Sequence, residues 1–273
     1  MTRVRHVVRI NSMKNFLFLW IALLFSMGSL SGEINPNIKN IDQPNTVLFV
    51  GNSYLYYNNS LHNHFKRMVE EHIQGFDGGD SVKSSTIGGS RLKHHDVSRL
   101  ISPQAISKIE KFDLVILQGG SSETLSKKNR KEFAYYAKRH IDSVKENDSE
   151  AALYMTHAYA DYYPRYEPNQ IEIIRKAYTK VGNENGVLVI PVGLAFDLAY
   201  QKRPNIKLHD DDGTHPGLLG TYLAACTVFA SIYDLSPIGM KYDYFGSIDE
   251  SDKRFLQEIA HEVTSTYFNK TLK

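Results

Sequence analysis

The feature that most constrains the fold is the alternation of short apolar segments with longer amphipathic ones. Five short segments are rich in aliphatic and β-branched residues: 46–50, 81–87, 113–117, 151–156 and 187–190. Between most of them, apolar residues recur every three or four positions, as they do in helices with one buried face. Apolar strands that alternate with helices form a parallel sheet covered on both faces. The sequence therefore predicts a single three-layer α/β/α domain with a five-stranded parallel sheet.

Five amphipathic or capped segments are expected to form the main helices. Helical periodicity predicts one helix ending near Gln74, one through 133–144 and one through 171–181. Pro216 suits the first turn of a further helix that runs through Val228, because proline has no N–H to leave unpaired there. Ser247 and Glu250 have capping-box spacing and predict the start of the last helix.

The first 31 residues are typical of a secretory signal peptide. Four basic residues precede an apolar run from Phe16 to Phe25, and small residues follow up to Ser31. This run is shorter than the roughly 20 residues that a membrane-spanning helix requires, which favours cleavage over a retained anchor. We expect residues 32–45 to be an N-terminal extension and residues 46–273 to be the folded domain. The protein is then secreted or periplasmic, with no stable membrane insertion after cleavage.

Charge, cysteine content and missing motifs exclude several functions. A formal net charge of +2 without a basic block argues against a nucleic-acid partner. The single cysteine, Cys226, cannot form an internal disulfide or a thiolate metal cluster. Neither Gly-x-Gly-x-x-Gly nor a Walker loop follows a predicted strand. The run His209 to Asp212 with His215 suggests a metal site, but no second His or Glu cluster at helical spacing supports it. We therefore expect neither a cofactor nor a metal.

Polar, glycine-rich segments follow the predicted strands. Ligands of parallel α/β sheets bind beyond the carboxyl ends of the strands, so these segments should converge on one site. They are 51–54 (Gly-Asn-Ser-Tyr), 88–91 (Gly-Gly-Ser-Arg), 118–123 (Gln-Gly-Gly-Ser-Ser-Glu) and 157–159 (His-Ala-Tyr), with 212–216 (Asp-Gly-Thr-His-Pro) near the end of the chain.

These residue types suit nucleophilic catalysis. A serine hydroxyl such as that of Ser53 needs a base to remove its proton, and His215 is the candidate base. Asp212, three residues earlier, is placed to hold the other imidazole nitrogen. The backbone N–H groups of Ser53 and Gly89 are candidate oxyanion donors. The ordinary alternatives are that Ser53 caps a helix and that the glycines only form turns.

Taken together, the motifs resemble those of the SGNH (GDSL-like) hydrolase superfamily, in particular its secreted bacterial carbohydrate-esterase members. The matching blocks are Gly51-Asn52-Ser53-Tyr54, Gly88-Gly89 and Asp212-Gly213-Thr214-His215, in the family's order. The resemblance implies a flavodoxin-like fold, a Ser53–His215–Asp212 triad and hydrolysis of small acyl esters. The third block departs from the family's Gly-x-Asn-Asp, since Gln118-Gly119-Gly120-Ser121-Ser122 stands there. Gln118 is our first candidate for the third oxyanion donor, and Ser121 is the second.

Several neighbouring residues are candidate substrate contacts: Asn52, Ser121, Arg91, His157 and Tyr159. Arg91 could equally form a surface salt bridge, and His157 could equally be structural. Tyrosines at 154, 159, 162, 163 and 166 suggest a sugar-stacking platform, although the chain has 17 tyrosines in all.

The expectation from sequence is a secreted serine esterase acting on a small-molecule or polysaccharide ester, with acetyl-carbohydrate specificity implied by the resemblance. Two alternatives remain. One is a general carboxylic-ester or lipid hydrolase. The other is a glycan-binding protein of the same fold that has lost turnover, because the third-block asparagine is missing. The oligomeric state is left open.

Overall fold

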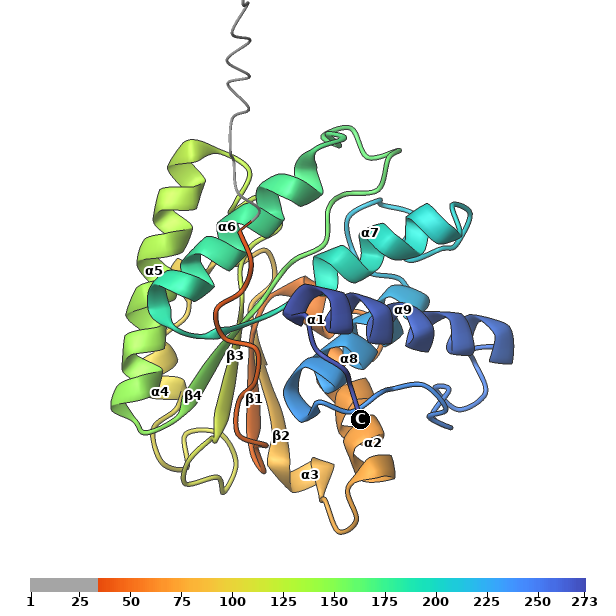
Figure 1. Ribbon diagram of the computed structural model, residues 1–273. Coiled ribbons are helices and arrows are strands. Elements are labelled where there is room, and N and C mark those ends of the chain that lie inside the picture. Colours follow the sequence, from red (N-terminus) through yellow and green to blue (C-terminus); the bar gives the residue numbers. More distant parts are fainter. Residues whose placement is uncertain (1–33) are drawn as a thin grey trace, which may run out of the picture. The chain divides into compact units, whose positions relative to one another are not determined.

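A computed structural model describes residues 34–273, and the predicted signal peptide lies outside them. Five strands form one parallel sheet in the order β2-β1-β3-β4-β5 (Figure 1). Their bounds are β1 Val47–Gly51, β2 Val82–Thr86, β3 Leu114–Gln118, β4 Glu150–Tyr154 and β5 Leu188–Ile190. Each of the five predicted strands is present, within two residues at either end. The predicted fold class is therefore confirmed.

Side-chain alternation along the strands divides the core into two layers. In β1, Val47 and Phe49 point to one face while Leu48 and Val50 point to the other, because successive residues of a strand face opposite ways. Both sets are fully buried, since helices cover both faces. Burying each such side chain contributes roughly 1.5–3 kcal/mol before the entropy cost of folding is counted.

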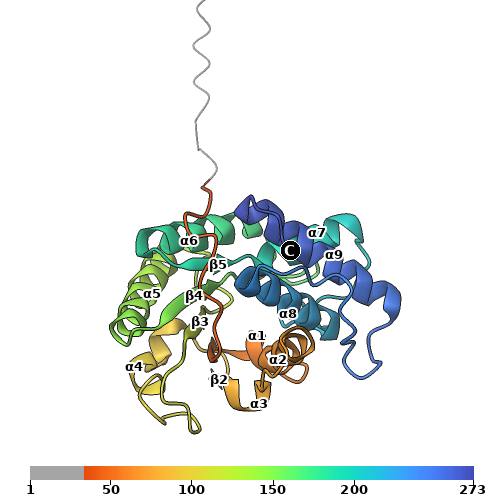
Figure 2. The same cartoon turned by 60° about the horizontal axis from the view of Figure 1, so that its bottom comes forward.

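Four longer helices cover the first face and two the second, as Figures 1 and 2 show from two directions. On the first face lie α2 (Leu61–His72), α7 (Val192–Lys202), α8 (Leu218–Tyr233) and α9 (Glu250–Phe268). On the second lie α5 (Lys127–Glu146) and α6 (Gln170–Asn185). The shorter helices are α1 (Ser53–Tyr56), α3 (Gly78–Ser81), α4 (Val97–Leu100) and the 3₁₀ turn η1 (Leu92–His94).

Three helix predictions need correction. Pro216 is not in a first helical turn: it pairs with His209 in an isolated bridge, and α8 begins two residues later. Ser247 does not cap the last helix, because Asp249 accepts the N–H of Asp252 and α9 starts at Glu250. Helix α7 was not predicted, because the segment 192–202 is apolar on most sides and shows little helical periodicity.

The segment that precedes β1 has no regular secondary structure and lies against other parts of the domain. Asn37 donates its N–H to the side chain of Asn183 on α6, and Asn183 donates back to the carbonyl of Asn35. In the part of the chain from 34 to 273, no helix is both long and apolar enough to cross a membrane.

Candidate active site

Ser53, His215 and Asp212 come together although 162 residues separate the first two. The Ser53 Oγ lies 2.8 Å from His215 Nε2, and His215 Nδ1 lies 2.5 Å from Asp212 Oδ2. Ser53 follows β1, and β1 lies between β2 and β3, where the strand order of the sheet reverses direction. Ligands of open α/β sheets bind at such a switch point.

The backbone around Ser53 is held by the residues on either side of it. Asn52 caps α1, since its Oδ1 accepts the N–H of Tyr54 and its Nδ2 donates to the carbonyl of Ser90. The N–H of Asn52 donates to Gln118 Oε1 at 2.9 Å. Gly51 permits this contact, because a Cβ there would lie 2.3 Å from the same oxygen. Asn52 therefore links the first two blocks and is not available as a substrate contact.

Two backbone N–H groups, those of Ser53 and Gly89, are candidate oxyanion donors. Within residues 34–273, neither of them donates a hydrogen bond. Gly89 is exposed, has a φ of +66° and would place a Cβ in open space. Its neighbours hold it near β1, because Ile87 donates its N–H to the Gly51 carbonyl and Ser90 accepts from Asn52. Such free, fixed donors suit a developing negative charge.

Gln118 does not occupy the position expected of a third oxyanion donor. Its side chain is 1% exposed, its Oε1 accepts from Asn52, and its Nε2 donates to the carbonyl of Gly119. Both ends of the amide are thus used inside the protein. Ser121, the second candidate, is half-buried and lies 3.4 Å from the hydroxyl of Tyr159. The prediction for Gln118 is wrong because this last residue of β3 packs against Gly51 and pairs both ends of its amide with backbone groups.

Replacing Gln118 by leucine should therefore lower stability as well as turnover. The leucine would leave the buried N–H of Asn52 unpaired, which costs about 1–3 kcal/mol in unfolding free energy. Urea unfolding would measure the loss. A side chain that only donated to the oxyanion would lower kcat and leave the urea midpoint unchanged, and that result would contradict the structural role.

The loop 209–216 fixes the geometry of Asp212 and His215. Asp212 Oδ1 accepts the N–H groups of Thr214 and His215, both at 2.9 Å, and the N–H of Asp210 donates to the His215 carbonyl. Partial burial opposes ionisation of Asp212, but the hydrogen bonds from His215 and Thr214 outweigh it and lower the pKa of the carboxyl. Asp212 is thus a carboxylate that can stabilise an imidazolium.

Two tyrosines of α1 and its C-terminal cap contact this loop, and sequence analysis gave them no role. The Tyr57 ring stacks on His215, with centroids 4.0 Å apart and planes 5° apart. The Tyr54 hydroxyl lies 2.7 Å from Thr214 Oγ1, and its ring meets the edge of His215. Tyr57 lies four residues after Ser53, on the same side of a helical turn, and this spacing was the available signal.

His157 is structural and does not contact the site from an open surface. It is 1% exposed, stacks between Tyr54 and Phe196, and donates from Nε2 to the Thr214 carbonyl at 2.9 Å. Burial keeps its pKa well below the usual value, so the ring is neutral. It therefore supports the loop 209–216 from beneath, and the substrate-contact prediction for it is corrected.

The side chains of Arg91 and Tyr159 also contact other side chains of the protein. The Arg91 guanidinium pairs with Glu132 at 3.1 Å, which is the salt bridge considered as its alternative. Tyr159 is 3% exposed, and its ring packs against that of Tyr163 at an angle of 43°. Glu123, to which the sequence assigned no role, is fully buried. It accepts the N–H groups of Gly120 and Leu92 and so connects the third block to η1. Burial raises the pKa of this carboxyl.

The metal alternative finds no support in the arrangement of side chains. Among residues 34–273, no three His, Cys, Asp or Glu side chains are grouped so as to hold a metal ion. His209 turns both ring nitrogens to other partners: Nε2 donates to the Ala158 carbonyl, and Nδ1 accepts from Tyr200.

A fall in pH should lower the unfolding free energy of the protein through His209, which lies in the loop 209–216. Burial lowers the pKa of His209 to about 4 from its usual 6.5, so the unfolded chain binds a proton that the folded chain excludes between these values. Stability from this group is complete above pH 6.5 and is lost as the pH falls towards 4. We expect the unfolding free energy of His209→Gln to fall less steeply over this range than that of the wild type. Equal slopes in urea unfolding across pH 4–7 would contradict the assignment.

Comparison with known proteins identifies the fold. No family model matches the sequence, and no curated protein matches it by sequence search. Solved structures do match. A DUF4886 family protein from Bacteroides uniformis shares 20% identity, with coverage of 83% of this chain and 97% of that one and a TM-score of 0.63.

Two further structures carry the name of a hydrolase class. A suggested SGNH hydrolase from Slackia heliotrinireducens shares 19% identity, over 68% of this chain and 97% of that one, with a TM-score of 0.52. The acetyl xylan esterase AlAXEase shares 16% identity, over 68% and 99%, with a TM-score of 0.54. The chain therefore has the SGNH hydrolase fold, as the sequence motifs implied.

Proposed function

We propose that this protein is a serine esterase that hydrolyses small acyl esters with Ser53, His215 and Asp212. One observation carries the proposal: the unbroken chain of hydrogen bonds from Ser53 Oγ through both nitrogens of His215 to Asp212. Ser53 is 8% exposed, and within residues 34–273 the N–H groups of Ser53 and Gly89 have no hydrogen-bond partner, which supports a role for both as oxyanion donors. A nucleophile, a base, an orienting carboxylate and oxyanion donors are the parts that acyl transfer requires.

The first half of the reaction forms an acyl-enzyme. Ser53 Oγ attacks the ester carbonyl carbon while its proton passes to His215 Nε2. Asp212 stabilises the resulting imidazolium, and the stacked ring of Tyr57 adds a cation–π contact. The carbonyl oxygen becomes negative and accepts hydrogen bonds from the N–H groups of Ser53 and Gly89. Each such donor lowers the barrier by about 3–4 kcal/mol.

The second half regenerates the enzyme. The tetrahedral intermediate collapses, the C–O bond to the alcohol breaks, and His215 gives its proton to the leaving oxygen. A water molecule then attacks the acyl carbon while His215 takes its proton. The bond from that carbon to Ser53 Oγ breaks, the carboxylic acid leaves, and His215 returns the proton to Oγ. Acid and base roles thus alternate on one imidazole.

An acetyl group on a carbohydrate is the substrate we propose. Support comes from the resemblance to secreted carbohydrate esterases and from the similar fold of an acetyl xylan esterase. Secretion or a periplasmic location, which the first 31 residues predict, would bring the enzyme to polysaccharides outside the cytoplasm.

Covalent labelling tests the nucleophile directly. A fluorophosphonate should form a bond from phosphorus to Ser53 Oγ and label the protein with one equivalent. Ser53→Ala should stay unlabelled, and peptide mass spectrometry should place the adduct on Ser53. Labelling at another serine, or none at all, would contradict the proposal.

A glycan-binding protein without turnover is the second candidate. The observation that favours it is the enclosed amide of Gln118, which leaves the two backbone donors without the third, side-chain donor that an asparagine supplies in the family pattern. A general carboxylic-ester or lipid hydrolase would differ from the proposed acetyl esterase only in its substrate. A series of p-nitrophenyl esters separates these two enzymes. Faster hydrolysis of acetyl than of long acyl esters supports the acetyl esterase, and the reverse order supports the lipid hydrolase.

A further inference from the structure

A cavity of about 640 Å³ lies beside the catalytic loop and excludes Ser53 and His215 from its lining. Its walls come from the segment 158–168, from α7 and from residues 204–211. His209 and Asp211 line it, and both belong to the loop 209–216 that carries Asp212 and His215. The cavity is therefore a separate space that shares one wall with the catalytic loop.

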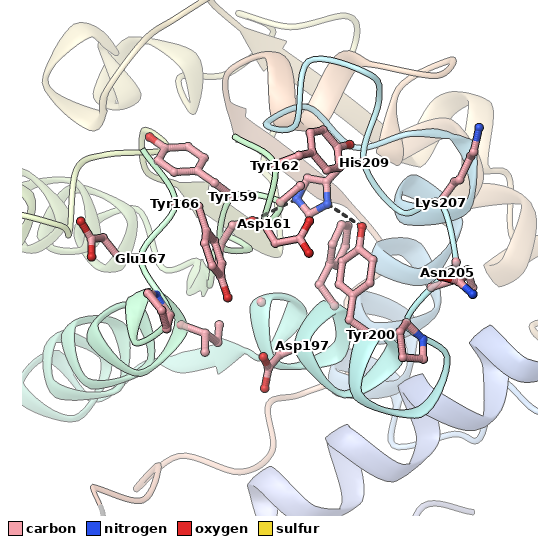
Figure 3. Close-up of a pocket in the computed structure, with 18 of the residues that line it drawn as sticks. Tyr159, Asp161, Tyr162, Tyr166, Glu167, Asp197, Tyr200, Asn205, Lys207 and His209 are labelled. Atoms are coloured by element: carbon pink, nitrogen blue, oxygen red, sulfur yellow. Dashed lines mark hydrogen bonds between the residues drawn. The ribbon is translucent and has the colours of Figure 1, made fainter. Parts of the chain in front are cut away.

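Aromatic rings form much of the cavity wall. Tyr159, Tyr166, Phe196 and Tyr200 line it. Figure 3 shows Tyr166 and Tyr200 on opposite sides of the cavity, with the carboxylate of Asp161 projecting between them. Tyr200 is fixed by its hydrogen bond to His209, so at least this ring is held in place. Aromatic faces attract cations through their quadrupoles.

The charges around the cavity are almost all negative. Four carboxylates line it, those of Asp161, Glu167, Asp197 and Asp211, against one ammonium, that of Lys207. In the part of the chain from 34 to 273, none of the four forms a salt bridge.

Among residues 34–273, neither of the two neighbouring cations, Lys207 and Arg165, forms a salt bridge with these carboxylates. Figure 3 shows Lys207 at the rim, with its ammonium directed away from Asp161. Arg165 is not part of the lining: its guanidinium stacks over Tyr159 and Tyr163 and donates to the Tyr163 hydroxyl. Three unbalanced carboxylates therefore remain, counting four against Lys207.

We propose that this cavity binds an organic cation, specifically an ammonium group with alkyl substituents. Such a cation is less strongly hydrated than a metal ion, so aromatic walls can replace its water while the carboxylates balance its charge. The cavity volume also exceeds what a bare ion needs, whereas it suits a small organic molecule. A neutral sugar would gain nothing from the excess charge, and an anionic one would be repelled.

This inference does not depend on ester hydrolysis. None of the residues that carry it belongs to the triad or donates to the oxyanion. Binding can therefore be measured on the Ser53→Ala variant, and it should be the same as in the wild type. Choline binding would therefore stand even if the protein did not hydrolyse esters, and ester hydrolysis would stand even if choline did not bind.

The test is calorimetric titration of the purified protein with choline and with its neutral carbon analogue, 3,3-dimethylbutan-1-ol. The two have nearly the same shape and differ in charge. Choline should bind with a stoichiometry of one, at least about tenfold more tightly than the alcohol, and more weakly as salt is added. Equal affinities, or no binding of choline, would overturn the proposal.

Variants locate the site. Asp161→Asn combined with Asp197→Asn should weaken choline binding by about fivefold or more, while Asp142→Asn on the distant surface of α5 should not change it. Tyr166→Leu should also weaken binding, with the exposed Tyr135→Leu as its control. Choline affinity that survives the Asp161 and Asp197 changes, or tighter binding of a neutral monosaccharide than of choline, would contradict the assignment.

Discussion

Ser53→Ala is expected to lower kcat for p-nitrophenyl acetate by about 10³-fold or more, with little change in KM. The substitution removes the nucleophile and leaves the donors at the Ser53 and Gly89 N–H groups in place, so binding should persist while the covalent step is lost. His215→Ala should have an effect of similar size, because Ser53 cannot be deprotonated without the imidazole 2.8 Å away.

The double variant Ser53→Ala/His215→Ala gives the sharper result. Residues that act as one unit are not additive, so the double variant should be no slower than either single one. Activity in EDTA should equal that in buffer for the wild type. A Ser53→Ala protein with wild-type turnover would refute the serine mechanism, and loss of wild-type activity to EDTA would point to a metal-dependent hydrolase.

Asp212→Asn is expected to produce the second-largest effect, a fall in kcat of about 10²- to 10⁴-fold. The asparagine can keep its oxygen towards the N–H groups of Thr214 and His215, so the loop should retain its shape. Its amide nitrogen would then face His215 Nδ1, where the carboxylate Oδ2 now lies at 2.5 Å. An amide there favours the wrong imidazole tautomer and does not stabilise the imidazolium.

Asp80→Asn provides the matched control, because it makes the same chemical change on the exposed helix α3, away from the site. It should leave kcat unchanged. The circular dichroism spectrum of Asp212→Asn should match that of the wild type, and its unfolding free energy in urea should lie within about 1 kcal/mol of the wild-type value. If Asp212→Asn keeps full activity, Asp212 does not orient His215, and the triad reduces to a Ser53–His215 pair.

Local sequence patterns were sufficient to predict the five-stranded sheet. The five strands could be predicted because runs such as Val47-Leu48-Phe49-Val50 are short, β-branched or aromatic in part, and apolar on both faces, as is typical of a covered parallel strand. Helix α7 and the true start of α8 were not visible. Segments 192–202 and 218–233 are buried on most sides, so their hydrophobic residues do not follow a helical period.

In the candidate site, too, some features could be predicted from the sequence and others could not. The sequence predicted that Ser53, Asp212 and His215 act together, because acyl transfer requires those residue types, and the structure brings the three side chains within hydrogen-bond distance. The sequence could not assign the direction of the Gln118 side chain, the stacking of Tyr57 on His215 or the buried position of His157. Each of these depends on contacts between segments far apart in the chain.

The fold class could therefore be predicted from the sequence alone, together with candidates for the reactive groups, since periodicity and residue chemistry are local properties. The tertiary structure alone decided which polar groups remain free to face a substrate. Gln118, Asn52, Arg91 and His157 all carry suitable functional groups, yet packing commits each to a partner inside the protein. Within residues 34–273, no acceptor pairs with the N–H groups of Ser53 and Gly89. A buried polar group must find a partner or lose the energy of its hydration, and only the folded chain determines which groups do so.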